Sequence, residues 1–418
     1  MSKMSTFMRT AAALVAGIAA VFAAATHAVA DKVHLKDGQV IEGRIEREEG
    51  GHVWIVETIG KISNTRFIMA DQIAKIERDS DAAPKAEAVK AAEPVRTTNA
   101  PRTGKATRVA ILNFGPPGDW ASKGKKVGDM VGVQVAAQPF REAIPLLEAD
   151  QVDVVVLRIN SGGGMLLEIP KINDLLHYEY KKRFRTVGWV ESAISAAAMS
   201  PYCLEEFYFM PKGNLGACTG WYGALQAVEG VELLEVLHMM ERYSQRGGRD
   251  PKIMRSMQIM EPLSCTIDEN GDVHWFQDLS GDHIVNPENR ILTFNSIDAV
   301  KYKFARGIAA TKEELVELMG LQEVEWVGQR AADLVDNFMI ATTDTENRLR
   351  EVLAKYNMAL AAAQGSPPDR RGAEVGKARR YLEELRRMIK VADNFKLLLG
   401  VDDEWFEVQE ENLRRLLR

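Results

Sequence analysis

The stretch VDVVVLRINSGGGM (residues 152–165) decides the fold that the sequence predicts. Its first eight residues, 152–159, are nearly all apolar, which is typical of a strand buried on both faces of a parallel sheet. Asn160 and Ser161 follow, and then come three glycines. Glycines at the end of a strand let the backbone approach a ligand closely and leave N–H groups pointing outward. Such a turn can form an oxyanion hole, but it can equally bind phosphate or nothing.

Strands and helices alternate around this stretch. We expect further strands at 109–114, 186–190 and 206–210, a helix within 127–149, and a long amphipathic helix at 229–246. Alternation of this kind implies right-handed β-α-β crossovers and a sheet covered on both faces. The predicted fold class is therefore α/β, with a mainly parallel sheet and flanking helices over residues 107–342.

A second motif, TVGWVESAISAAAM, follows the next predicted strand. It places Ser195 at the start of an alanine-rich helix, where helix N–H groups and the positive end of the helix dipole lie close to the hydroxyl. This position suits a nucleophile. The alternative is that Ser195 is simply an N-cap residue, which is a common role for serine at a helix start.

Together the two motifs resemble the Clp-protease-like serine peptidases of the ClpP/crotonase superfamily, in particular the NfeD-type membrane-bound proteases and signal peptide peptidase A. The segment NSGGG is similar to the family's Asn-Ser-Pro-Gly-Gly turn, and ISAA (194–197) to its Ala-Ser-Ala-Gly nucleophile motif. The segments FMP (209–211) and LGA (215–217) are similar to its Met-Ala-Pro and Ile-Gly-Ala segments. The resemblance covers residues 107–325, and it leaves Ser192 and Ser200 off the pattern.

The resemblance implies a Clp-like fold and a role for each matching residue. Ser195 would be the nucleophile, and the backbone N–H groups of Gly163 and Ala196 would form the oxyanion hole. The implied activity is an ATP-independent peptidase that cleaves peptides or membrane-protein fragments through an acyl-enzyme. It needs no metal or other cofactor, and Clp-like domains commonly form homo-oligomers. The substrate backbone would pair with a strand formed by Gly164, Met165 and Leu166.

The general base is less clear, because the lysine of the exported family branch has no counterpart. No lysine lies between Lys212 and Lys252. The approximate counterpart of the family lysine is Val231 or Glu232, and His238 lies two helical turns beyond Val231 on the same face. Because histidine titrates near neutral pH, His238 is the candidate base, with Lys252 as a second candidate. The alternative is that His238 is a packed helix residue.

Other departures from the family pattern support a second class of function. Gly162 replaces the family proline, Ala197 replaces a glycine, and Pro201 interrupts the helix after Ser195. A chain without the base would be a catalytically inactive peptide-binding or scaffold protein. A third reading, a crotonase-type enzyme acting on coenzyme A thioesters, rests on fold analogy alone. Export argues against it, because coenzyme A is a cytosolic cofactor.

The N-terminal part of the chain predicts export and a small separate domain. Lys3 and Arg9 precede an apolar run and an Ala28-Val29-Ala30 site, so residues 1–30 are expected to be a signal peptide cleaved after Ala30. The mature protein would be periplasmic or otherwise extracytoplasmic, soluble or peripherally attached to a membrane. Residues 31–79 alternate apolar and polar residues between Asp-Gly and Gly-Gly turns, which predicts a small SH3/Sm-like antiparallel barrel. Residues 80–106 form a linker.

The C-terminal part, residues 343–418, is charged and helical, with a break at 365–369 (GSPPD). Apolar residues recur on one face, as expected for a helical hairpin or coiled-coil arm. The chain as a whole has 418 residues, a formal net charge of −6 and only three cysteines. This composition gives no reason to expect nucleic acid as a partner, a disulfide framework or a zinc site.

Overall fold

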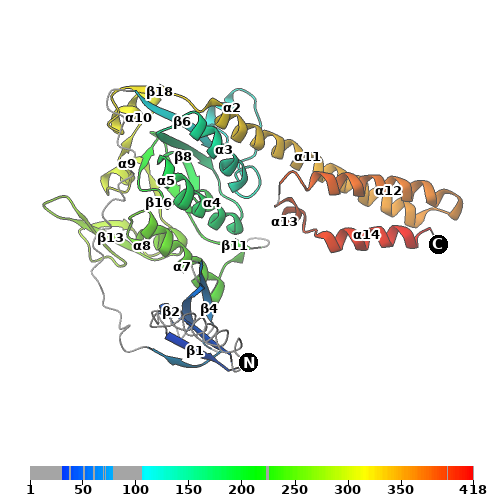
Figure 1. The fold of residues 1–418 in the computed structure, drawn as a ribbon, viewed down its shortest axis with the longest axis horizontal. Helices are drawn as coiled ribbons and strands as arrows, with labels where there is room; N and C mark the ends of the chain where they lie inside the picture. The colour runs from blue at the N-terminus through cyan, green and yellow to red at the C-terminus, as the bar shows by residue number, and fades with distance from the viewer. Residues whose placement is uncertain are drawn as a thin grey trace, which may run out of the picture. The chain divides into compact units, whose positions relative to one another are not determined.

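A computed structural model of the chain describes residues 31–36, 39–49, 52–59, 62–68, 70, 72–78, 106–222, 226–392 and 394–417 (Figure 1). The predicted signal peptide and all of the predicted linker except its last residue lie outside these residues. The chain divides into two compact units, Met1–Ala91 and Ala92–Arg418, and each is described by itself. None of the described helices is long and apolar enough to span a membrane.

The first unit is an antiparallel sheet of five strands, in the order β4-β3-β2-β1-β5. Its buried core is made by alternate residues such as Val33, Val53 and Ile55, which is why the sequence alternates here. The predicted antiparallel sheet is confirmed. Among the described residues no ladder joins β4 to β5, so closure into a barrel stays a prediction. The strands are β1 (Asp31–Leu35), β2 (Val40–Glu49), β3 (His52–Ile59), β4 (Ile62–Ile68) and β5 (Ile73–Glu77).

The second unit is built on an eight-stranded sheet with the main order β16-β10-β8-β7-β6-β18, and β9 joins β8 to β17. All of its pairings are parallel except that of β10 with β16. The predicted α/β class with a mainly parallel sheet is therefore confirmed. The strands are β6 (Thr107–Phe114), β7 (Val154–Ser161), β8 (Arg185–Ile194), β9 (Phe207–Phe209), β10 (Asn214–Gly216), β16 (Thr293–Asn295), β17 (Gly307–Ile308) and β18 (Val324–Trp326).

Both faces of this sheet are buried, as the apolar strand at its centre predicted. Leu157 and Ile159 of β7 pack into the large core that includes α3 (Ala137–Ala149) and α4 (Ile169–Leu175), whereas Val154 and Val156 face the core that includes α10 (Lys312–Leu318). The predicted helix within 127–149 is confirmed as α3. The remaining short helices here are α2 (Gly118–Ser122), η1 (Leu166–Glu168), η2 (Leu176–Tyr180), α5 (Lys181–Arg183), α6 (Ala196–Met199) and α9 (Ser296–Lys301).

The segment between β10 and β16 is a helical and β-stranded insertion. The predicted long helix at 229–246 is confirmed as α7 (Gly230–Arg246), and it packs against α8 (Pro251–Gln258). A small antiparallel sheet in the order β14-β13-β15 follows, and a two-stranded sheet precedes α7. These strands are β11 (Trp221–Tyr222), β12 (Gln226–Ala227), β13 (Leu263–Ile267), β14 (Val273–Phe276) and β15 (His283–Asn286).

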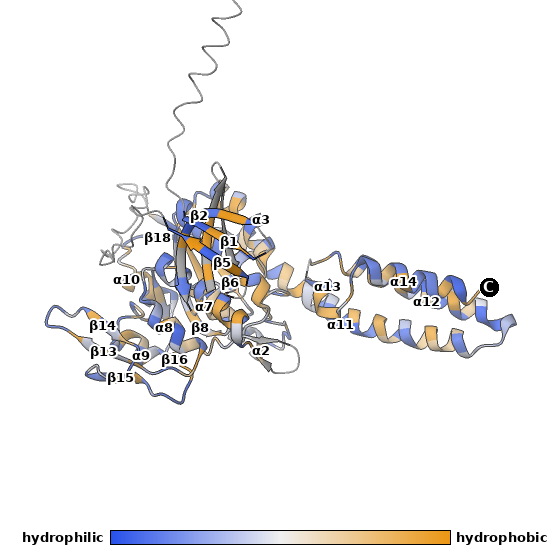
Figure 2. Cartoon of the chain, turned by 90° about the horizontal axis from the view of Figure 1, so that it is seen from below, coloured by the Kyte–Doolittle hydropathy of each residue, from blue (hydrophilic) through white to orange (hydrophobic). Residues whose placement is uncertain are grey.

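The C-terminal helices form a hairpin, as predicted. Helix α11 (Gln329–Gly365) runs without interruption across the domain boundary predicted at 342/343, and α12 (Pro368–Met388) packs back along it. Two shorter helices, α13 (Phe395–Leu399) and α14 (Asp403–Arg415), complete the arm. Figure 2 shows α12 as mostly hydrophilic, because its apolar residues are confined to the buried side. That side packs into a core with Val352, Tyr356, Leu382, Leu385, Phe395 and Phe406.

Candidate active site

Ser195 and the glycine turn lie at the carboxyl ends of two neighbouring parallel strands. Strand β7 ends at Ser161, which pairs with Ala193 near the end of β8. The turn of residues 162–164 follows β7, and Ser195 follows β8. Because carboxyl ends of parallel strands meet at one edge of a sheet, two motifs that are about thirty residues apart in the sequence come together.

The backbone of Ser195 has a conformation that few residues other than glycine adopt. Its φ is 54° and its ψ is −126°. Hydrogen bonds fix this turn, since Ser195 N–H donates to Gly216 O at 3.0 Å and Ser195 O accepts from Ala198 N–H at 2.9 Å. Such strain between a strand and a helix is a feature of turns that expose a nucleophile.

The hydroxyl of Ser195 does not cap the helix that follows it. The side chain makes no capping hydrogen bond, and it has no hydrogen-bond partner within the described part of the chain. The interpretation of Ser195 as an ordinary N-cap is therefore wrong. The helix α6 is only four residues long, as Pro201 led us to expect. Ser195 is half-buried, so a ligand can reach its hydroxyl.

Gly163 is in direct contact with this turn. Its φ is +102°, and a Cβ at this position would lie 2.7 Å from Ser195 Cβ, 2.8 Å from Ile194 O and 3.1 Å from Ala196 N. Only glycine fits here, both because of the positive φ and because of the close approach. The structure thus brings together Gly163, Ser195 and Ala196, which are the three residues that the resemblance assigned to the nucleophile and the oxyanion hole.

The two expected oxyanion donors differ in their hydrogen bonding. Ala196 N–H is the first of helix α6, so it has no acceptor within the helix. Gly163 N–H donates to Ser161 Oγ at 3.1 Å, and Ser161 Oγ donates to Asp129 O at 2.5 Å. An oxyanion would therefore have to replace or share the Ser161 hydroxyl at Gly163. No sequence motif indicated Asp129, and Ser161 was noted only as part of the NSGGG turn. A serine two residues before a glycine is nevertheless a known local acceptor for its N–H.

The predicted substrate-binding strand is shorter than expected. Val131 N–H donates to Gly163 O at 2.9 Å, and Met165 N–H donates to Val131 O at 2.8 Å. In such a parallel bridge the N–H and C=O of Gly164 point to the opposite side, where an added strand would pair. Gly164 is exposed. The assignment of Leu166 to this strand is wrong, because Leu166 begins the helical turn η1 that leads into α4.

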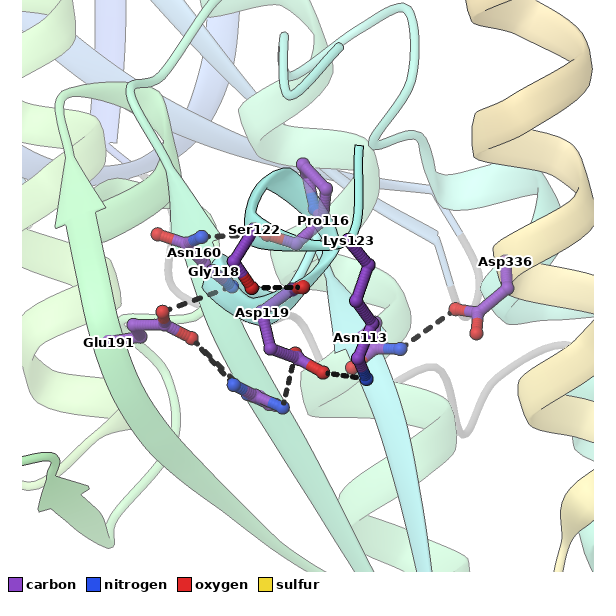
Figure 3. Close-up of polar contacts among 10 residues, drawn as sticks. Asn113, Pro116, Gly118, Asp119, Ser122, Lys123, Asn160, Glu191 and Asp336 are labelled. Carbon is purple, nitrogen blue, oxygen red and sulfur yellow. Dashed lines mark hydrogen bonds and ion pairs between the residues drawn. The ribbon is translucent and has the colours of Figure 1, made fainter. Parts of the chain in front are cut away.

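A polar network holds the loop after β6 onto the ends of β7 and β8 (Figure 3). Asn160 Nδ2 donates to Pro116 O at 2.7 Å, so this loop is tied to the residue that starts the NSGGG turn. Glu191 accepts from Gly118 N–H at 3.0 Å and from Arg158 Nη2 at 3.0 Å. The side chains of Arg158 and Glu191 are only 23% and 24% exposed, so this ion pair is partly shielded from water.

Neither candidate base is bonded to Ser195. His238 lies on α7, is 5% exposed, and has Nδ1 3.7 Å from Glu241 Oε2. Lys252 Nζ lies 3.1 Å and 3.3 Å from the carboxylate oxygens of Asp250. The structure therefore does not bring either residue into hydrogen-bond contact with the Ser195 hydroxyl.

Cys218 is a further nucleophilic group next to the site. Its thiol lies 3.8 Å from Ser195 O, and it is fully buried. Burial raises the pKa of the Cys218 thiol, so the thiolate does not form near neutral pH. Cys203, Cys218 and Cys265 are all buried and free, as expected for small apolar core residues. Of the two groups, only Ser195 is accessible to a substrate.

An open cleft of about 590 Å³ is lined by residues that follow the glycine turn in the sequence and by residues of α7. One wall is formed by Leu166, Leu167 and Pro170, directly after Met165. The opposite wall is one face of α7, and Val228 completes the lining. His238 lies three residues after Glu235 on α7, but it is buried and does not line the cleft. The helix residues of the cleft are Glu232, Glu235, Val236 and Met239.

The chain is similar in structure to proteases of the kind that the sequence motifs predicted. A mutant of the 1510-N membrane-bound stomatin-specific protease is 13% identical, and the match covers 53% of this chain and 97% of that chain with a TM-score of 0.36. A second 1510-N mutant, in complex with a substrate peptide, is 13% identical, with 56% of this chain and 100% of that chain covered at a TM-score of 0.36. A ClpP1 mutant from Listeria monocytogenes is 15% identical. The match covers 50% of this chain and 94% of that chain, with a TM-score of 0.27.

No protein-family model matches the sequence, and neither does any of the curated proteins with which it was compared. Structural similarity at this level of identity and TM-score says nothing about activity. The function proposed below therefore depends on the geometry of Ser195, Gly163 and Ala196.

Proposed function

We propose that the chain is a serine peptidase that forms an acyl-enzyme on Ser195. The observation that carries this proposal is the contact of Gly163 with Ser195 and Ala196. The backbone of Ser195 is held at a φ of 54°, and no described residue forms a hydrogen bond with its hydroxyl. Strained backbone conformations of this kind cluster at active sites, which supports a catalytic role for Ser195.

The reaction would follow the usual course of acyl transfer. Ser195 Oγ attacks the carbonyl carbon of the scissile peptide bond and loses its proton to a base. The carbonyl oxygen becomes an oxyanion beside the N–H groups of Ala196 and Gly163, which stabilise its charge. The leaving amine takes the proton, and water then hydrolyses the ester on Ser195. Each N–H donor of this kind contributes a factor of about a hundred or more to the rate.

His238 is the residue that we propose as the base. Glu241 lies one helical turn away, and its carboxylate faces Nδ1 of His238 at 3.7 Å, where it would stabilise an imidazolium. Catalytic hydrogen bonds are often formed only when substrate is bound. The proposal therefore includes a substrate-bound form in which the His238 ring reaches the Ser195 hydroxyl.

A second candidate function is a catalytically inactive peptide-binding protein. It is favoured by two observations on the described residues, namely that Ser195 Oγ has no basic partner and that Gly163 N–H is already bonded to Ser161 Oγ. Such a protein would keep the cleft and the exposed edge of Gly164 for binding without turnover.

The experiment that separates the two functions is labelling of the full chain with a fluorophosphonate, followed by mass spectrometry of the modified peptide. A peptidase is expected to be labelled at Ser195 and to hydrolyse members of a fluorogenic peptide library, and Ser195→Ala abolishes both. Ser192→Ala is the matched control, because the Ser192 hydroxyl already bonds to Asn214 Oδ1 at 3.0 Å. His238→Ala lowers both rates if His238 is the base. A folded chain with no labelling and no turnover would support the binding protein instead.

We also propose that the protein is exported, cleaved after Ala30 and assembled as a homo-oligomer. The proposal is supported by the basic and apolar pattern of residues 1–30 and by the family resemblance. N-terminal sequencing of protein from the periplasmic fraction and sedimentation analysis of the mature chain test it. A mature N-terminus at Met1 or a monomer at micromolar concentration would contradict it.

A further inference from the structure

We infer that the cleft beside the glycine turn selects peptide segments in which a large apolar side chain is adjacent to a lysine or arginine. The inference deepens the proposed function, since it takes the cleft as the place where the substrate lies. It depends on three features of the cleft: its position, its apolar walls and two acidic side chains on one rim.

The lining of the cleft begins two residues after Gly164, the residue with the exposed backbone edge. It starts at Leu166, the residue after Met165, and Met165 N–H is bonded to Val131. A peptide that paired with the outward edge of Gly164 would therefore continue directly along the cleft. Gly220 also borders this region, since a Cβ at Gly220 would contact Val228 and Leu166.

The walls of the cleft group several apolar side chains that water can reach, and grouped exposed apolar side chains are typical of binding sites. Leu167 is 65% exposed. Val236 and Met239 face it from α7, and Pro170 lies on the wall of Leu167. The volume of about 590 Å³ is sufficient for more than one amino-acid side chain. An apolar side chain of the substrate would bury this surface.

The acidic side chains Glu232 and Glu235 lie on the same face of α7, three residues apart. Both are exposed, and neither forms an ion pair with any residue that the structure describes. Two carboxylates at this spacing repel each other and destabilise the helix slightly. Glu232 also lies in the first turn of α7, where the helix dipole favours an acid, but this reason does not apply to Glu235 in the next turn.

Charge complementarity therefore selects the occupant. A cation placed between Glu232 and Glu235 would relieve their repulsion, whereas an acidic side chain would add to it. An occupant that is only apolar would leave both carboxylates without a partner. An apolar residue next to a lysine or arginine would both bury the apolar walls and pair with the two carboxylates.

The test measures binding and not cleavage. Ser195→Ala full-length chain is titrated with three fluorescein-labelled peptides that are identical except for a central Leu-Lys, Leu-Gln or Leu-Glu pair. We expect the Leu-Lys peptide to bind about fivefold more tightly than the Leu-Gln peptide, with the Leu-Glu peptide weakest. The difference should shrink at high salt, because the carboxylates are exposed. Met239→Asp should weaken the binding of all three peptides.

Charge-reversal variants provide the decisive comparison. Glu232→Lys/Glu235→Lys should reverse the order of the three peptides. Glu313→Lys/Glu317→Lys changes the net charge equally on an exposed face of α10 outside the cleft, and it should leave the order unchanged. Equal binding of the three peptides, or a lysine preference that survives the first double variant, would overturn the inference.

The results also separate this inference from the proposed function. Selective binding with no fluorophosphonate labelling of Ser195 would support the cleft assignment and contradict the peptidase. Labelling and turnover without selectivity in the cleft would support the peptidase and overturn the cleft assignment.

Discussion

Gly163 and Ser195 are packed so closely that a methyl group on Gly163 would lie 2.7 Å from the Cβ of Ser195. This contact joins the turn after β7 to the turn after β8. It places an N–H group, a hydroxyl and a helix N-terminus within one site, although none of these three features is specific alone.

The first prediction concerns this contact. Gly163→Ala should lower the rate of fluorophosphonate labelling at Ser195 by about a hundredfold or more, because the added methyl displaces the nucleophile and one oxyanion donor. Gly124→Ala is the matched control: Gly124 also has a positive φ, +77°, but a Cβ there would have no neighbour within 4 Å. Both variants should lose about 1 kcal/mol or more of stability from backbone strain. Equal labelling rates in the two variants would show that the contact has no catalytic role.

The sequence predicted the parts of the structure that follow from periodicity and from local motifs. The apolar run at 152–159 gave the central strand, and the motifs around Gly163 and Ser195 gave the two turns that meet. Both depend on short-range patterns, and the parallel sheet then brings them together by topology.

The remaining parts depend on contacts that no local pattern encodes. Val131 and Asp129 lie in a loop without regular structure, yet they hold the glycine turn through backbone and side-chain hydrogen bonds. Leu166 was predicted as strand because it follows the glycine turn, but a helix of seven residues, α4, begins soon afterwards and imposes its own conformation. The boundary predicted at 342/343 came from the change to a charged composition. The backbone of α11 continues across it, and what changes along the helix is the core into which its apolar residues pack.

The second prediction concerns the ion pair that supports the turn. Arg158→Ala should cost about 2 kcal/mol of unfolding free energy, because Glu191 would remain partly buried without its cation. Lys355→Ala is the control: it removes an exposed ion pair with Glu351 on α11, and its cost should be about 0.5 kcal/mol or less. Chemical denaturation of both variants measures the difference. A loss for Arg158→Ala no larger than that of the control would show that the network in Figure 3 does not stabilise the fold.

The third prediction concerns a half-buried acid, Asp336, on α11. Burial raises the pKa of Asp336, and the hydrogen bond from Asn113 at 2.9 Å only partly offsets this. The folded chain therefore binds the Asp336 proton more tightly than the unfolded chain. This contribution to stability is complete at a pH below the pKa that Asp336 has in the unfolded chain. It is lost as the pH rises through the higher pKa of the folded chain, and it is absent at neutral pH.

Asp336→Asn removes the half-buried charge and keeps an oxygen that can accept from Asn113. We expect its melting temperature to rise by about 2 °C at neutral pH, and the gain to shrink as the pH approaches about 4. Asp344→Asn, at an exposed position of the same helix, should change little at either pH. Calorimetry at the two pH values measures this. A lower melting temperature for Asp336→Asn at neutral pH would mean that the carboxylate has a stabilising partner.

The last prediction links the C-terminal arm to the active site. Asn394 Nδ2 donates to Gly132 O at 2.7 Å and to Glu168 Oε2 at 2.9 Å. Gly132 is next to Val131, whose backbone donates to Gly163 O and accepts from Met165 N–H. Glu168, only 3% exposed, accepts from Ala137 N–H at 2.9 Å and so ties the same region to the start of α3. Asn394 therefore holds the loop that in turn holds the substrate-binding edge.

Asn394→Ala should loosen this loop without unfolding the arm, whose apolar core does not include Asn394. We expect faster hydrogen exchange at Val131 and Met165, because their N–H groups form the hydrogen bonds that hold this loop. Peptide binding should weaken about threefold, which corresponds to the loss of roughly one hydrogen bond. Gln409→Ala is the control, because it removes a 2.9 Å bond to Tyr356 within the arm and does not touch the loop. If both variants accelerate exchange at Met165 equally, the effect comes from the stability of the arm as a whole. If neither does, the Gly132 contact does not control the site, and the arm and the active site behave independently.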